Sequence, residues 1–155
     1  MLFRSKKGIK RHEVLQPLSR HHMVALHLGV KLRRANTPES LLSNKEIRQE
    51  VIDFWEPDGQ THFREEEEIL LPVYAQYGDI QDPLIIEMLV EHVQIRSLIR
   101  QITNATTPLI EEMHELGHLL EQHVRKEERI IFPMIEKALP EDVLQEMAPY
   151  IHDEQ

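Results

Sequence analysis

Cysteine is absent from the sequence, which excludes disulfides, thiolate zinc sites, iron–sulfur clusters and cysteine nucleophiles together. Any metal bound by this chain must therefore be held by nitrogen and oxygen atoms. Glycine is scarce, with 5 residues, and aromatic residues make up only 5% of the chain. Runs of β-branched residues are also few, so the composition favours helices over a β-sheet.

No apolar run approaches the roughly 18 residues that a membrane-spanning helix requires. Residues 1–11 are basic but lack the apolar segment of a signal peptide, so we expect a cytoplasmic protein with no membrane partner. Basic charge is in short supply, because 27 acidic residues outnumber 18 lysines and arginines and leave a net charge of −9. The broad basic face of a nucleic-acid binder is missing, and we expect no such partner.

The hydrophobic periodicity predicts an all-α protein, an up-down four-helix bundle with a short extra C-terminal helix. The predicted helices cover about residues 17–35, 44–77 with a break at 57–59, 83–102 and 107–138, and a short final one begins at about residue 140. Asn44, Asp82 and Thr107 are the expected N-caps of the second, third and fourth helices, and Gly78 is expected to close the second. At 155 residues we expect a single domain over residues 1–155, with its core at about 12–139.

Apolar residues recur in alternating steps of three and four along each predicted helix, and two histidines interrupt these stripes. His22 lies mid-stripe in the first helix, and His92 lies mid-stripe in the third. The predicted core positions are Leu15, Leu18, Ala25, Gly29, Leu32, Ile47, Val51, Phe54, Ile69, Ile85, Met88, Ile95, Ile99, Ile102, Met113, Leu116, Leu120 and Ile130.

An internal repeat links the second and fourth helices. The segment His62–Pro72 recurs as His123–Pro133 at a constant offset, since 123 − 62, 127 − 66 and 133 − 72 all give 61. His, Arg, Glu, Glu, Ile and Pro coincide at matched positions. A bundle with approximate two-fold symmetry would place the two copies opposite one another.

The repeat also carries the candidate metal ligands. His62 with Glu66, and His123 with Glu127, each lie four residues apart and therefore on one helix face. With His22 and His92 the set has four imidazoles and two carboxylates, so that two metals could each take two histidines while the glutamates bridge. Such ligands suit iron or manganese, with zinc as an alternative, and leave positions open for water, an oxo group or a small ligand.

Simpler interpretations compete with a metal site. A lone mid-stripe histidine is more often a hydrogen-bonded core residue, and a run such as Glu65–Glu68 is usually a solvated helix face. A ferritin-like site would need Glu-x-x-His on two helices, but the two copies here, ending at His114 and His118, fall on one helix. His114 and His118 are four residues apart and could form a surface metal site, but we favour a solvated face. The full set of six ligands, buried without metal, would lose several kcal/mol of hydration per group, which favours metal.

Three segments resemble the hemerythrin-like family, also called the HHE cation-binding domain. They are Leu18-Ser-Arg-His-His22, the two His-x-x-x-Glu-Glu segments that end in proline, and Glu91-His92, and the resemblance covers roughly residues 12–139. It implies the four-helix bundle and two iron ions with an oxo or hydroxo bridge. The family frame also favours His22 over His21, which occupies the place where many relatives carry an acid.

Two departures separate this chain from the oxygen-carrying members. Those members have a histidine four residues after the third-helix ligand, where this chain has Arg96, and His-x-x-x-x-Asp on the fourth helix instead of His-x-x-x-Glu. The set is more similar to the branch that handles nitric oxide, peroxide or iron itself, including proteins implicated in repairing iron centres. Reversible oxygen carriage is therefore not the favoured function.

Three functions are consistent with these patterns. The first is a di-iron protein that binds or senses dioxygen, nitric oxide or peroxide, or takes part in iron handling. The second is a di-iron enzyme for nitric oxide or peroxide reduction, iron oxidation or iron-centre repair. The third is a metal-free helical interaction protein. No residue is assigned as catalytic, and Tyr74 and Tyr77 are candidates only for tuning the redox chemistry.

Overall fold

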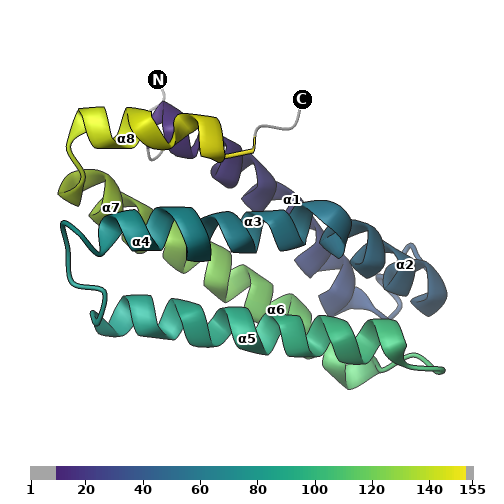
Figure 1. Ribbon diagram of the computed structural model, residues 1–155. Helices are drawn as coiled ribbons and strands as arrows, with labels where there is room; N and C mark the ends of the chain where they lie inside the picture. Colours follow the sequence, from purple (N-terminus) through teal and green to yellow (C-terminus); the bar gives the residue numbers. More distant parts are fainter. Residues whose placement is uncertain (1–9, 153–155) are drawn as a thin grey trace.

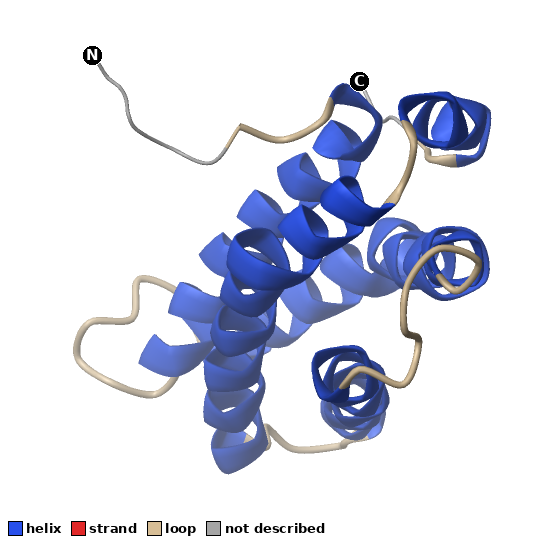
Figure 2. Cartoon of the chain, turned by 90° about the vertical axis from the view of Figure 1, so that its left-hand side faces the viewer, coloured by secondary structure: helices blue, strands red, loops and turns tan. Residues whose placement is uncertain are grey.

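The computed structural model describes residues 10–152, and this part of the chain forms helices without any strand (Figure 1). A view turned by 90° shows these helices and the loops that join them (Figure 2). The all-α prediction is confirmed. The helices are α1 (Gln16–Arg34), α2 (Asn44–Phe54), α3 (Gln60–Glu65), α4 (Leu71–Tyr74), α5 (Pro83–Asn104), α6 (Ile110–Lys126), α7 (Phe132–Ala138) and α8 (Glu141–Met147).

These elements form four long rods and one short helix. The second rod consists of α2, α3 and α4 in line, and the fourth consists of α6 and α7 (Figure 1). The first rod, α1, packs against α2 and α6, and α5 packs against the same two partners. Each rod therefore lies beside its neighbours in the chain, which confirms the up-down four-helix bundle. The short α8 lies across the N-terminal end of α1, where Gln145 on α8 donates to Glu13 at 3.0 Å.

The predicted helix ends are partly correct. Asp82 caps α5 by accepting from the Leu84 N–H, as expected. The cap of α2 is Ser43, one residue before the predicted Asn44, and Ser43 and Glu46 form a reciprocal capping box. Thr107 is wrong as the cap of the fourth helix, because α6 begins only at Ile110. The Leu109 carbonyl accepts its first helical hydrogen bond, from the Met113 N–H.

One break interrupts the second rod, and the rod ends earlier than predicted. The predicted break at residues 57–59 is confirmed, since Glu56 has non-helical angles of φ −109° and ψ 117°. At the other end of this rod, α4 ends at Tyr74, three residues before the predicted end at Tyr77. Gly78 lies beside the ring of Tyr74, where an added Cβ would come within 2.4 Å of the ring carbons. Glycine is required there for this close contact.

Both copies of the repeat contain one wide helical turn of the π type. These turns are η3 (Glu66–Leu70) and η4 (Glu127–Ile131), and each is followed by a proline, Pro72 or Pro133. A proline inside a helix removes one hydrogen bond and clashes with the carbonyl four residues before it, which accounts for a widened turn at this point. The extra residue shifts the helix face by one position.

This shift corrects two predicted core positions. Ile130 is 47% exposed, and Ile131 takes its place in the core at 0%. In the other copy Ile69 is only partly buried, whereas Leu70 is fully buried. The remaining predicted core positions are buried.

The core consists of two apolar clusters on either side of a polar layer. One cluster contains Ala25, Ile95 and Leu120, and the other contains Leu18 and Met88. His22 comes between Leu18 and Ala25 along α1, and His92 comes between Met88 and Ile95 along α5. The candidate ligands therefore lie in the middle of the bundle.

A pair of glycines brings α1 and α6 together. A Cβ on Gly29 would lie 3.2 Å from the carbonyl oxygen of Gly117, and a Cβ on Gly117 would lie 2.8 Å from the carbonyl oxygen of Gly29. The backbones are thus in direct contact, and this crossing places α1 beside the helix that carries His123. Among residues 10–152, no helix is both long enough and apolar enough to cross a lipid bilayer.

Candidate metal centre

The structure brings all six predicted ligands together in the polar layer. Each of the four rods contributes at least one of them, and all six side chains are buried, with Glu66, His92 and Glu127 at 0% exposure. They are His22, His62, Glu66, His92, His123 and Glu127.

The six residues form two groups of four that share both glutamates. In one group, single ligand atoms of His22, His62, Glu66 and Glu127 all lie within 4.8 Å of one another. In this group Nε2 of His62 is 2.9 Å from Oε2 of Glu66, and Nε2 of His22 is 2.8 Å from Oε1 of Glu127. Each Nε2 atom thus faces a different carboxylate.

The second group repeats this geometry with the other two histidines. Ligand atoms of His92, His123, Glu66 and Glu127 also lie within 4.8 Å of one another. Nε2 of His92 is 3.0 Å from Oε1 of Glu66, and Nε2 of His123 is 2.8 Å from Oε2 of Glu127. Each glutamate therefore turns one oxygen to each group, as a bridging carboxylate would.

The unsatisfied atoms of this layer fit a pair of metal ions. Nε2 of His22, His92 and His123, one oxygen of Glu66 and both oxygens of Glu127 are buried without a well-aligned hydrogen bond. Leaving several such atoms unpaired would be costly, because each loses its hydration on burial. Ligand atoms about 2.1 Å from an octahedral metal, at right angles to one another, lie about 3 Å apart. The spacings of 2.8–3.0 Å between nitrogen and oxygen match this value.

A second ring of carboxylates lies behind three of the four imidazoles. Nδ1 of His22 donates to Glu128 at 2.5 Å, Nδ1 of His92 donates to Glu67 at 2.6 Å, and Nδ1 of His123 donates to Glu91 at 2.8 Å. Histidines that bind metals usually donate their other ring nitrogen in this way, which orients the ring and raises its basicity. These carboxylates were not predicted as part of the site. The repeat contained the signal for two of them, since 128 − 67 also gives 61.

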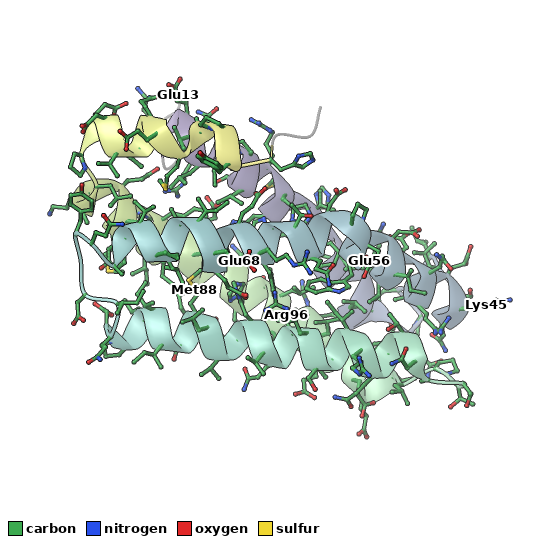
Figure 3. The ribbon with its side chains drawn as sticks, in the orientation of Figure 1. Glu13, Lys45, Glu56, Glu68, Met88 and Arg96 are labelled. Carbon is green, nitrogen blue, oxygen red and sulfur yellow. The ribbon has the colours of Figure 1, made fainter. Side chains whose placement is uncertain are left out.

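The outer carboxylates are themselves held by cationic or hydroxyl side chains. Glu67 accepts from Arg96 at 2.6 Å, and Arg96 comes from α5 and points towards the helix that carries Glu67 (Figure 3). Glu91 accepts from Lys126 at 2.6 Å. Glu128 accepts from Ser19 at 2.7 Å and from Arg11 at 3.2 Å. Arg96, which departs from the pattern of the oxygen carriers, thus anchors the carboxylate behind His92.

A model of one protein family matches this chain over residues 14–135, and that family is the hemerythrin HHE cation-binding domain. The match covers most of the chain. The chain belongs to this family. No curated protein and no solved structure matches it. Membership implies cation binding, and the buried histidine and glutamate cluster of this HHE domain is suited to hold the cations.

Electrostatics in the HHE domain couple the imidazoles to the carboxylates. Burial acts to lower the pKa of His22, but the carboxylates of Glu127 and Glu128 outweigh it and raise the pKa to about 10. Burial likewise opposes the charged form of His92, and Glu127, Glu66 and Glu67 outweigh it to raise that pKa to about 11. Burial disfavours the charged form of Glu127, but the adjacent His123 and the other imidazoles hold its pKa well below the usual value. In the absence of cations, protons on the imidazoles therefore balance the negative charge of the buried carboxylates.

The fourth imidazole of the HHE domain, His62, lacks a carboxylate partner at Nδ1. Its Nδ1 is buried without a hydrogen bond, and the ring of His21 lies beside it, with the ring centroids 4.9 Å apart. Burial, reinforced by His62 and His22, lowers the pKa of His21 to about 3. A neutral His21 thus lies behind this ligand.

The other histidines and tyrosines of the HHE domain lie outside the ligand layer. His114 is partly buried and its Nε2 is 2.8 Å from the Ala35 carbonyl oxygen, so the predicted solvated face is wrong for His114 and correct for the exposed His118. Tyr74 packs in the apolar cluster that contains Leu18, and Tyr77 is exposed. The run Glu65–Glu68 is a solvated face only at Glu68.

Proposed function

We propose that this chain holds two iron ions between its four helices and uses them to bind or sense a small ligand such as dioxygen, nitric oxide or peroxide, or to handle iron. The observation that carries the proposal is the pair of four-ligand groups that share Glu66 and Glu127. Nitrogen and oxygen ligands of this kind suit iron, with manganese or zinc as alternatives. In this proposal His22 and His62 hold one ion and His92 and His123 hold the other.

The protein's own residues supply charge balance, orientation and shielding. The two shared glutamates would offset part of the cationic charge in a layer that has an apolar cluster on each side. Glu67, Glu91 and Glu128 orient three of the imidazoles. Two iron ions held side by side would supply redox chemistry and a binding position for a small ligand.

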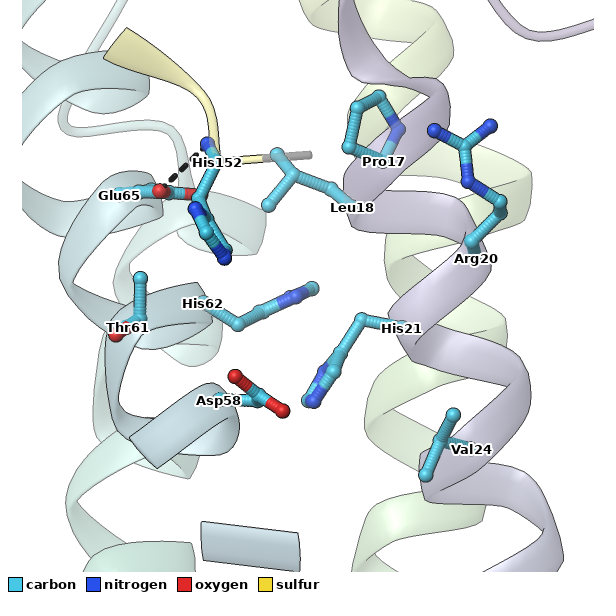
Figure 4. Close-up of a pocket in the computed structure, with 10 residues that line it drawn as sticks. All are labelled: Pro17, Leu18, Arg20, His21, Val24, Asp58, Thr61, His62, Glu65 and His152. Carbon is cyan, nitrogen blue, oxygen red and sulfur yellow. Dashed lines mark hydrogen bonds between the residues drawn. The ribbon is translucent and has the colours of Figure 1, made fainter. Parts of the chain in front are cut away.

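Turnover is the second candidate, and one observation favours it. A pocket of about 140 Å³ reaches His62 from the surface, which would let a small reactant approach the centre (Figure 4). In that case the protein would be a di-iron oxidoreductase that reduces nitric oxide or peroxide or oxidises ferrous iron.

Metal analysis with spectroscopy tests the proposal. The purified protein is reconstituted anaerobically with ferrous iron, and its iron content and ultraviolet-visible spectrum are measured before and after addition of dioxygen, peroxide or nitric oxide. We expect about two irons per chain and a spectral change with at least one of these ligands. Less than one iron per chain would overturn the proposal.

Two measurements distinguish binding from turnover. A spectral change that reverses when the ligand is removed supports binding or sensing, whereas repeated consumption of peroxide or nitric oxide with an added reductant supports the enzyme. His118→Ala is a matched control, because His118 is exposed on the same helix as His123. This variant should retain the iron content and the spectrum of the unmodified protein.

A further inference from the structure

The two halves of the ligand layer have matching ligands, and the internal repeat relates those on the second and fourth helices. The ligands His62 and His123 match at an offset of 61, and His22 and His92 match at an offset of 70. Under the first offset, Glu67 matches Glu128, and these two carboxylates accept from the matched imidazoles of His92 and His22. This part of the outer ring therefore follows the symmetry.

The symmetry fails at one position. Glu91, which precedes His92, accepts from Nδ1 of His123 at 2.8 Å. The matched residue before His22 is His21, since 91 − 21 also gives 70. His21 lies against the ring of His62, as Glu91 lies beside His123, but Nδ1 of His62 makes no hydrogen bond. One half of the layer thus has an imidazole at the position where the other half has a carboxylate.

Two pockets reach this same half of the layer. The pocket of about 140 Å³ is lined by His62 and His21, which point into the same space from α3 and α1 (Figure 4). The carboxylates of Asp58 and Glu65 also line it, and such groups attract cations. A second pocket, of about 380 Å³, is lined by His22. Solvent and solutes therefore come closest to the pair His22 and His62.

We propose that the cation position held by His22 and His62 is the exchangeable one, and that the position held by His92 and His123 retains its cation. This inference rests on the proposed two-metal centre. His21 causes the difference, because it occupies the place from which a carboxylate would accept a hydrogen bond from Nδ1 of His62 and fix that ring. Loss of such an outer partner typically costs 10–100-fold in metal affinity. One divalent cation per chain is thus retained and one exchanges with solution through the pocket.

Chelator-driven release of iron tests the inference. The protein loaded anaerobically with ferrous iron is mixed with a chromogenic chelator for ferrous iron, and release is followed by absorbance. We expect two phases of about one ion each, with rates that differ by about tenfold or more. Release of both ions at one rate would overturn the inference. Failure to load even one ion per chain would instead overturn the two-metal proposal on which it rests.

A residue swap shows whether His21 causes the difference. His21→Glu should slow the fast phase towards the slow one, and Glu91→His should accelerate the slow phase, while His27→Glu, an exposed change on the same helix as His21, should alter neither. An unchanged fast phase in His21→Glu would overturn the role of His21. If either swapped variant fails to fold by circular dichroism, His21→Gln and Glu91→Ala test the same two positions.

Discussion

The two halves of the ligand layer agree in the residues that face the centre and differ in the residues behind them. On one side Nδ1 of His123 donates to Glu91, and on the other Nδ1 of His62 has no hydrogen bond and lies beside His21. A repeat in the sequence therefore specifies equal ligands without specifying equal environments. Any difference in cation binding between two such sites must therefore come from the side chains behind the ligands.

The largest expected effect comes from removing a residue on which both halves depend. Glu127→Ala removes a carboxylate shared by the two groups, and we expect it to lower the metal content below one ion per chain. His62→Ala should reduce the content by at least one ion. Elemental analysis after anaerobic loading measures both, and unchanged metal content in the two variants would contradict the ligand assignment.

Matched outer carboxylates test the part of the layer that is symmetrical. Glu67→Gln and Glu128→Gln should each weaken metal binding by about 10–100-fold, because each removes the charged acceptor behind one imidazole. Competition with a chelator of known affinity gives the two values. Glu68→Gln, at the exposed neighbour of Glu67, is the control and should leave the affinity unchanged. An effect in only one of the matched pair would show that the symmetry already fails at these residues.

The pH dependence should differ between the metal-free and the metal-loaded protein. The pKa values of His22 and His92 are raised to about 10 and about 11, above the ordinary 6.5, so their contribution to the stability of the metal-free protein is fully present below pH 6.5 and falls as the pH rises towards 10. Cations require the unprotonated imidazoles, so metal affinity should rise over the same range. Urea unfolding of the metal-free protein and zinc titrations at pH 6.5, 8 and 9.5 measure both trends. A metal-free protein that gains stability over this range would contradict the assignment.

The smallest effect is expected at the residue that already breaks the symmetry. His21→Ala should leave the metal content nearly unchanged, because Nδ1 of His62 has no hydrogen bond to lose. His22→Ala should remove at least one ion, since Nε2 of His22 lies 2.8 Å from the shared Glu127. Elemental analysis compares the two variants, and the reverse result would shift the ligand on the first helix by one residue.

Periodicity and spacing predicted the bundle and the six residues that meet in its centre, because burial and helix geometry are local consequences of the sequence. They failed where the helix departs from regular geometry. The wide turns before Pro72 and Pro133 moved the core from Ile130 to Ile131, and a fixed period does not include an extra residue. The role of the six residues as metal ligands stays a prediction.

The outer ring shows a second limit of sequence reasoning. Glu67 and Glu128 were detectable in the repeat, but their partners come from distant segments. Arg11 reaches Glu128 over a separation of 117 residues, and Arg96 reaches Glu67 over 29. No local pattern predicts such pairs, because they arise only when the four rods are packed together.

The contact between Gly29 and Gly117 has a consequence for mutational tolerance. The two apolar clusters can accept other side chains of similar volume, because neighbouring side chains can repack around them. The glycine crossing has no side chain to adjust, and it lies seven residues, or about 10 Å, along α1 from His22. Much of the core should therefore tolerate substitution. Gly29 and Gly117 should not, because their lack of a side chain sets the separation of α1 and α6.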